Sequence, residues 1–133
     1  MIDIARMVFN TNQLTSPAWA GDYGDREHLI PGGARLKEAD FAADAQGRKL
    51  VPSGTLLGRT IAERDAGDGF GPFAAGDEEV YLLWQDVTDA TKNADADLYR
   101  HGSIVKENYL PGAPTAAQLT AIRARYATTR GVR

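Results

Sequence analysis

Two stretches of the chain carry the hydrophobic pattern of β-strands. Glu79–Gln85 is the most apolar run in the sequence, and its composition predicts a buried strand. Thr55–Ala62 is a second strand candidate, because it is rich in Thr, Leu and Ile and follows a turn at Ser53-Gly54. Gly58 interrupts this second run, which predicts either a β-bulge or a place where another part of the chain approaches the backbone closely.

Three weaker patterns predict further strands between polar connections. Ala34–Lys37 predicts a short strand, and Arg48–Val51 predicts a strand that ends at Pro52. Ala94–Lys106 alternates between two faces, as a half-exposed strand does. Residues 64–78, rich in Gly, Asp and Pro, are predicted to form a loop.

One helix is indicated near the C-terminus. Thr115 and Gln118 have the spacing of a capping box, in which the side chain of each residue accepts a hydrogen bond from the backbone N–H of the other. The apolar face of this helix is formed by Leu119, Ile122 and Tyr126. Gly131 is expected to lie just past its end.

Residues 1–33 show no regular period, yet they contain apolar and aromatic side chains. A disordered tail is usually poorer in aromatic residues. Two interpretations stay open: an arm that docks on another protein, or an irregular lid on the protein's own core. On the first interpretation, the side chains that bind the partner are Ile2, Ile4, Met7, Phe9, Leu14, Trp19 and Tyr23.

Together these patterns predict a mainly β fold of the α+β class with one short C-terminal helix. An irregular N-terminal arm (residues 1–33) precedes a β-rich domain with its helix (residues 34–133), and 133 residues suit a single core. The predicted core residues are Leu56, Ile61, Val80, Leu82, Leu83, Trp84, Leu119 and Ile122.

The net charge of −3 is unevenly distributed along the chain. Residues 63–98 hold ten acidic and two basic side chains, whereas residues 99–133 hold six basic and one acidic. The acidic block repels phosphate, so we expect no nucleic-acid partner, and we interpret the basic block as a solvated helix face that pairs with an acidic neighbour, such as another copy of the chain. No apolar run is long enough to span a membrane, and Asp3 and Arg6 interrupt the apolar N-terminal stretch, so we expect neither a membrane partner nor a secretory signal.

The sequence contains no recognisable set of catalytic or metal-binding residues. There is no cysteine, which excludes thiolate chemistry, and His28 and His101 have no partners at ligand spacing. Asn93–Asp97 places oxygen-bearing side chains at every second residue, but the glycine and late glutamate of a calcium loop are missing. The Gly-rich residues 67–72 lack the Lys-Ser/Thr ending of a phosphate-binding loop. We therefore expect no catalytic residue, no metal and no cofactor.

Several segments follow one another in a distinctive order. Gly47–Gly58 combines a short strand, a turn and a Gly-Thr step, and the apolar run Glu79–Gln85 follows after a Gly-rich loop. Tyr99–Val105 then carries an Arg-His-Gly step, and Tyr109-Leu110-Pro111 leads into the helix. This order, over roughly residues 34–126, resembles the lambda-type tailed-phage head decoration proteins, also called capsid cement proteins.

The resemblance implies a structural protein and not an enzyme. It implies a small β-barrel or β-tulip-like body that forms a homotrimer on the outer surface of an icosahedral phage head, after synthesis in the host cytoplasm. The partner would be the major capsid protein, bound at local threefold positions, and the effect would be a shell stiffened against DNA pressure. The N-terminal arm would add backbone hydrogen bonds to a capsid strand.

Two alternatives stay open. A small trimeric β enzyme acting on nucleotides or sugars would need carboxylates that converge at a subunit cleft. A head–tail joining or tail-tube component of a virion would have a similar small β body.

Overall fold

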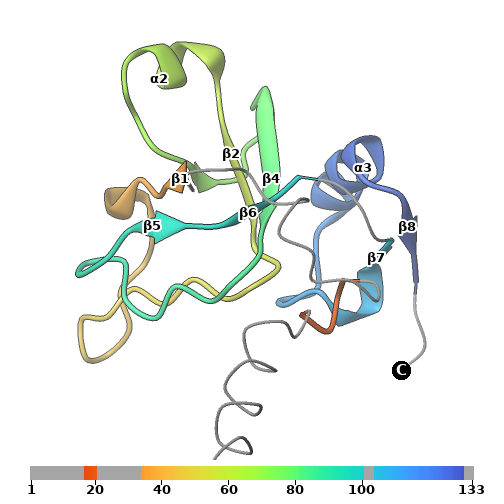
Figure 1. Ribbon diagram of the computed structural model, residues 1–133, viewed down its shortest axis with the longest axis horizontal. Coiled ribbons are helices and arrows are strands. Elements are labelled where there is room, and N and C mark those ends of the chain that lie inside the picture. The colour runs from red at the N-terminus through yellow and green to blue at the C-terminus, as the bar shows by residue number, and fades with distance from the viewer. Residues whose placement is uncertain (1–16, 21–33, 101–103, 131–133) are drawn as a thin grey trace, which may run out of the picture.

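The computed structural model describes residues 17–20, 34–100 and 104–130. Within these residues the protein is mainly β with one longer helix near the C-terminus, which confirms the predicted α+β class (Figure 1). The strands are β1 (Ala34–Arg35), β2 (Leu56–Arg59), β3 (Gly71–Pro72), β4 (Glu79–Leu83), β5 (Asp95–Ala96), β6 (Leu98–Tyr99), β7 (Val105–Lys106) and β8 (Thr128–Thr129). The helices are η2 (Glu38–Asp40), α2 (Ile61–Asp65), η3 (Glu107–Tyr109) and α3 (Ala116–Arg125), of which η2 and η3 are 3₁₀-helices.

A four-stranded antiparallel sheet forms the centre of the body, in the order β3-β2-β4-β6. Two small sheets accompany it: β1 pairs with β5 in antiparallel fashion, and β7 pairs with β8 in parallel. The described strands do not close into a barrel, so the body differs here from the barrel-like form that the resemblance implies.

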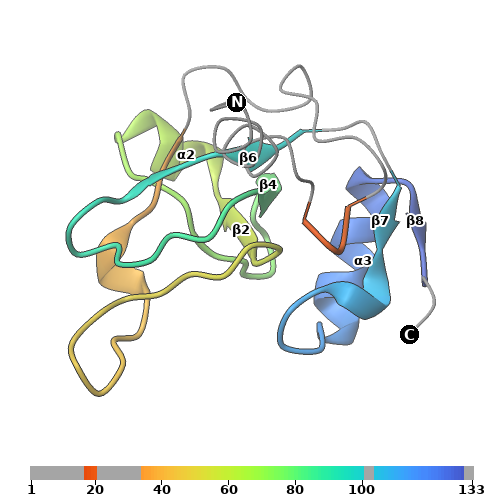
Figure 2. The ribbon, with the colours of Figure 1, turned by 60° about the horizontal axis from the view of Figure 1, so that its bottom comes forward.

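The central sheet is apolar on both faces, because alternate residues of a strand point to opposite sides. Leu56, Leu82 and Tyr99 lie in register on one face, and Leu83 pairs with Leu98 on the other. The helix-side cluster comprises Trp19, Ala20, Leu56, Leu82, Trp84, Tyr99, Val105, Leu110, Ile122 and Tyr126. The β1-side cluster comprises Leu36, Val51, Leu57, Phe70, Leu83, Val87, Ala90, Ala96 and Leu98. Figure 2 shows α3, β7 and β8 grouped together on one side of β2, β4 and β6, which is the side of the helix-side cluster.

Most of the predicted core residues are buried. The fully or nearly buried ones are Leu56, Leu82, Leu83, Trp84 and Ile122. Val80 packs against the helix-side cluster but is only partly buried, and Leu119 is half-buried on α3. Sequence periodicity thus located the buried strand β4 and the inner face of the C-terminal helix.

The predicted strand over Thr55–Ala62 is too long. It ends at Arg59, because Thr60 caps a short helix through a capping box with Glu63. The Thr60 hydroxyl accepts a bond from the Glu63 backbone N–H (3.1 Å), and the Glu63 carboxylate accepts one from the Thr60 N–H (2.8 Å). Ile61 therefore opens α2 and is half-buried, so its assignment to the strand and to the core was wrong.

Two other predicted strands are shorter than expected. In Arg48–Val51, only Val51 pairs as in a sheet, through an isolated bridge to Val87. At the other end of the stretch, the Arg48 backbone N–H donates to the Asp44 carboxylate at 2.9 Å and so belongs to a turn. Ala94–Lys106 divides into β5, β6 and β7. The adjacent β6 residues Leu98 and Tyr99 are both completely buried, since both faces of the sheet are covered at this strand.

Gly58 marks a close approach of another part of the chain, and not a bulge. Its register with Val80 continues the pairing of β2 with β4 without interruption. A Cβ atom on Gly58 would clash with a carboxylate oxygen of Asp77, which itself accepts a bond from the Ala74 N–H at 2.9 Å. The residue is glycine because the Asp77 turn occupies the space of a side chain.

The C-terminal helix forms as the sequence predicts. Thr115 and Gln118 make both bonds of the capping box, and the helix ends before Tyr126. Gly131, expected after the helix end, lies outside the described residues. The Tyr126 side chain then turns into the core, where its hydroxyl accepts a bond from the Leu82 N–H (3.0 Å) and donates one to the Tyr99 carbonyl. The hydroxyl thereby bridges β4 and β6 at a point where these two residues face each other in register.

We expect Tyr126→Phe to lower the free energy of unfolding by about 1–3 kcal/mol, because it leaves two buried backbone groups without their partner. Burial also raises the pKa of the Tyr126 hydroxyl, so it is protonated and can donate at neutral pH. The measurement is urea denaturation, with Tyr109→Phe as the control because Tyr109 is exposed. Equal midpoints for the two variants would contradict the bridging role.

Candidate interaction surface

The segment Pro17–Ala20, called the anchor segment, packs into the helix-side cluster. Trp19 is 2% exposed, and its indole N–H donates to the Ser53 hydroxyl at 2.9 Å. Its ring meets the rings of Trp84 and Tyr99 edge to face, with centroids 5.8 and 5.4 Å apart. These contacts combine a large buried apolar surface with a satisfied polar atom, which is the environment that an indole needs inside a protein.

Backbone contacts hold the anchor segment as well. The Trp19 carbonyl accepts a bond from the Lys106 N–H of β7 at 2.6 Å, and the Ala20 N–H closes a turn onto the Pro17 carbonyl at 3.0 Å. Gly54 lies directly against the indole: a Cβ there would stand 2.9 Å from Trp19 atoms, and its φ of +89° favours glycine. The anchor segment is thus tied to the turn before β2, to the aromatic core and to β7.

This placement corrects one of the assignments made from sequence. Trp19 was placed in an arm that binds a partner, but it is a core residue and is not available for such a contact. At this position the alternative interpretation, a segment that covers the protein's own core, is the right one. The other predicted arm residues lie outside the described part of the chain: Ile2, Ile4, Met7, Phe9, Leu14 and Tyr23.

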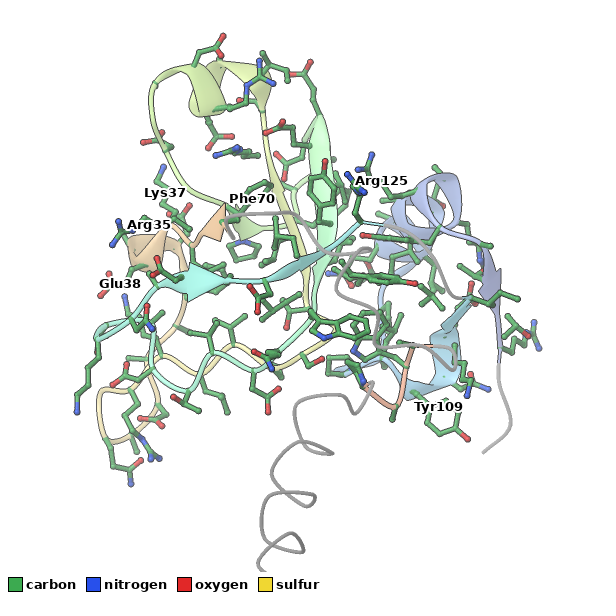
Figure 3. All side chains as sticks on the ribbon, in the orientation of Figure 1. Arg35, Lys37, Glu38, Phe70, Tyr109 and Arg125 are labelled. Atoms are coloured by element: carbon green, nitrogen blue, oxygen red, sulfur yellow. The ribbon has the colours of Figure 1, made fainter. Side chains whose placement is uncertain are left out.

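Three large apolar side chains in the described part of the chain are exposed. Among the described residues, the large hydrophobic side chains with high exposure are Leu50 (56%), Ile104 (50%) and Tyr109 (36%). Ile104 and Tyr109 flank β7, the strand that binds the Trp19 carbonyl, and Figure 3 shows Tyr109 projecting away from the ribbon. Sequence reasoning did not select these residues, because exposure of single apolar side chains has no signature in the hydrophobic pattern.

A carboxylate–guanidinium pair connects η3 to α3. Glu107 accepts two bonds from Arg123 of α3, each 2.8 Å long, and its side chain is 8% exposed while that of Arg123 is half-exposed. The pair lies in a groove that Arg130 also lines. Hydrogen bonding to Arg123 holds the pKa of the Glu107 carboxyl below its ordinary value, against the opposing effect of burial.

This lowered pKa predicts a pH dependence of stability. The carboxyl binds protons less readily in the folded state, so its contribution is complete above the unfolded-state pKa of about 4.3 and is lost as pH falls through the folded-state value. Glu107→Gln should therefore cost stability at pH 7 and converge on the wild type in strong acid. Denaturation midpoints from pH 2 to 7 measure this, with Asp95→Asn at an exposed carboxylate as the control. A difference that stays constant with pH would contradict the pair.

Other charged side chains are also paired within the body. Glu79 binds both Arg59 (2.7 Å) and Arg64 (3.3 Å), and the Arg59 guanidinium lies 4.2 Å from the centre of the Phe70 ring. Arg125 stacks over Tyr81 at the same distance, between α3 and β4 (Figure 3). Part of the acidic and basic blocks is therefore used inside one copy of the chain.

The described residues show no converging chemistry. No three His, Cys, Asp or Glu side chains of the described ranges come together as metal ligands, and no helix there is long and apolar enough to cross a membrane. His28 and His101 lie outside the described residues. Asp86, in the polar region after β4, accepts a hydrogen bond from the Ser53 N–H at 2.6 Å, which stabilises the turn before β2. Compared with protein-family models, curated proteins and solved structures, the chain matches none.

Proposed function

We propose that this chain is a head decoration protein that binds the outer surface of an icosahedral phage head. It binds the major capsid protein as a homotrimer at local threefold positions, and it stiffens the shell without catalysing a reaction. It needs no cofactor, and neither nucleic acid nor a membrane is a partner. The chain acts in the virion, on the outside of the capsid.

One structural observation supports this proposal more than the others. Three of the four segments that carry the resemblance contribute to the central sheet: Gly47–Gly58 to β2, Glu79–Gln85 to β4, and Tyr99–Val105 to β6 through Tyr99. These segments lie apart in the sequence, and their strands pair with one another in the order β2-β4-β6.

The position of Trp19 adds a second support, because it divides the N-terminal region into two parts. Residues 17–20 belong to the body, and residues 1–16 precede it as a stretch that includes Ile2, Ile4, Met7 and Phe9. An apolar segment attached to a firmly packed body suits binding by strand addition to a partner.

The test is co-sedimentation of the purified protein with expanded heads assembled from the major capsid protein of the phage that encodes the chain. We expect saturation at one copy per capsid subunit, and loss of binding when residues 2–16 are deleted. The deletion stops before Pro17, because a longer one would remove Trp19 from the core. Binding that is unchanged by the deletion would contradict the docking role of this segment.

Chemical cross-linking on the saturated heads tests the threefold arrangement. We expect trimers as the largest product, because neighbours around a local threefold axis are close to each other but not to the next trimer. Dimers or hexamers as the limiting species would contradict it. Electron microscopy of the same particles distinguishes the other virion function, since a head–tail joining protein would lie at a single vertex.

A further inference from the structure

We propose that neighbouring copies of the chain contact each other through a basic groove on one copy and an acidic lobe on the next. The basic groove lies between η3, α3 and Arg130, and the acidic lobe consists of α2 and the turn at residues 74–78. The inference rests on the proposed function, and it names the two surfaces that meet between copies of the homotrimer.

The basic groove has a volume of about 570 Å³, and residues of the 110–114 loop and Leu119 of α3 form part of its wall. The guanidinium groups of Arg123 and Arg130 line it as well. Glu107 binds the Nε and Nη2 atoms of Arg123, and no described residue accepts a bond from Nη1. Arg130 has no carboxylate within 4 Å in the described part of the chain. The groove therefore keeps an uncompensated positive charge and unused donors that suit a carboxylate.

The acidic lobe holds more carboxylates than cations, namely Glu63, Asp65, Asp77 and Glu78 against Arg64. Arg64 bonds to Asp65 at 3.4 Å, whereas the other three carboxylates have no lysine or arginine nitrogen within 4 Å among the described residues. Each of these three accepts a bond from one backbone N–H, at 2.8–3.0 Å and through a single oxygen. The lobe thus presents negative charges that are held in place but not neutralised.

The two surfaces lie apart within one copy. Figures 1 and 2 both show α2 and α3 on different sides of the central strands, so the body separates the lobe from the groove. The opposite charges of these two surfaces therefore meet only between copies. Contact between two different surfaces is heterologous, and repeating it around a threefold axis closes a ring in which every copy uses both.

The occupant of the groove is assigned to a second copy because both complementary surfaces belong to the same chain. Exposed ion pairs add little affinity, so the charges act mainly by setting the orientation in which copies meet. Ion pairs inside one copy do not cancel them, since Arg130, Asp77 and Glu78 take no part in the pairs found within the described residues.

Cysteine cross-linking tests this contact without removing a charge. The chain contains no cysteine, and Ala75 in the lobe and Ala113 in the groove are exposed, so each substitution adds one accessible thiol. Saturated heads that carry a mixture of Ala75→Cys and Ala113→Cys proteins are treated with a short bis-maleimide. We expect about tenfold more covalent dimer from the mixture than from either variant alone, because unlike surfaces face each other. Ala45→Cys, in an exposed turn outside both surfaces, replaces Ala75→Cys in the control and should give no such increase.

A charge reversal separates the electrostatic contact from simple proximity. Adding Arg130→Glu to the Ala113→Cys protein should lower the yield of mixed dimer about fivefold or more, because like charges then face each other. Arg35→Glu is the matched control, since Arg35 is exposed and has no carboxylate within 4 Å among the described residues. Figure 3 shows Arg35 on the other side of the body from Tyr109 of η3, so its reversal should change the yield by less than about twofold. Denaturation midpoints show that the variants are folded.

The same mixtures are cross-linked in free solution at high protein concentration, so that the result does not depend on heads. Mixed dimers that Arg130→Glu reduces and Arg35→Glu does not reduce support the inference. A protein that binds heads without forming mixed dimers, or that responds equally to both reversals, overturns the inference and leaves the proposed function standing. Mixed dimers in solution from a protein that does not bind heads overturn the proposed function alone, and the absence of both overturns both.

Discussion

Replacing Trp19 with alanine is expected to lower the free energy of unfolding by about 3–5 kcal/mol, the range measured for large aromatic side chains in protein cores. Trp19 is 2% exposed, and its ring contacts Trp84 and Tyr99 edge to face. The substitution removes this packing and leaves the Ser53 hydroxyl without the indole N–H. Domains of this size are stable by about 5–15 kcal/mol in total, so the expected loss is a large share of the protein's stability.

Graded variants separate packing from the polar contacts of the indole. Ser53→Ala removes the acceptor of the indole N–H and also the hydroxyl that donates to the Trp84 carbonyl (2.7 Å), so it should cost about 1–3 kcal/mol because these groups are then unsatisfied. Trp19→Phe keeps most of the ring packing and should fall between Ser53→Ala and Trp19→Ala. Urea denaturation followed by circular dichroism measures all three. An alanine variant as stable as the wild type would show that the anchor segment is not part of the folded core.

The sequence predicted those parts of the fold that local signals determine. Alternating or continuous apolar runs located β2 and β4, and the capping box at Thr115 located α3. The same signature occurs at Thr60 and Glu63, where it was overlooked because a strand pattern precedes it. Two local signals competed in this stretch, and the reciprocal capping bonds ended the strand after Arg59.

Tertiary contacts account for the features that the sequence did not predict. The Tyr126 hydroxyl binds the Leu82 N–H across 44 positions of the chain, and the Trp19 indole binds Ser53 across 34. Neither pair has a period or a spacing that could reveal it. For the same reason Trp19 was placed with the docking residues: an aromatic side chain in an aperiodic segment has the same appearance whether it covers its own core or another protein.

The candidate interaction surface could also be predicted only in part from the sequence. The apolar residues before Pro17 are visible in the sequence, so a docking segment could be predicted there. The exposure of Ile104 and Tyr109 could not be predicted, because the exposure of a single apolar side chain has no signature in the hydrophobic pattern.

Replacing Leu83 with alanine is expected to cost about 2–5 kcal/mol, because the side chain is completely buried and alanine leaves a cavity. Leu83 ends β4 and pairs with Leu98 in the β1-side cluster. Its backbone accepts a bond from the Gly54 N–H (2.7 Å) and donates one to the Thr55 carbonyl (3.0 Å). Alanine keeps both bonds, so the loss reports side-chain packing and not a broken strand.

Leu50→Ala is the matched control, since it removes the same atoms from an exposed leucine and should change stability by less than about 0.5 kcal/mol. Denaturant titration of both variants gives the difference directly. Because Leu83 and Trp19 belong to clusters on opposite faces of the sheet, the Leu83 variant should also keep the near-ultraviolet signal of the tryptophans in its folded state. A cost near zero for Leu83→Ala would mean that β4 presents another face to the β1-side cluster. A folded variant that lost the tryptophan signal would mean that the two clusters are one core.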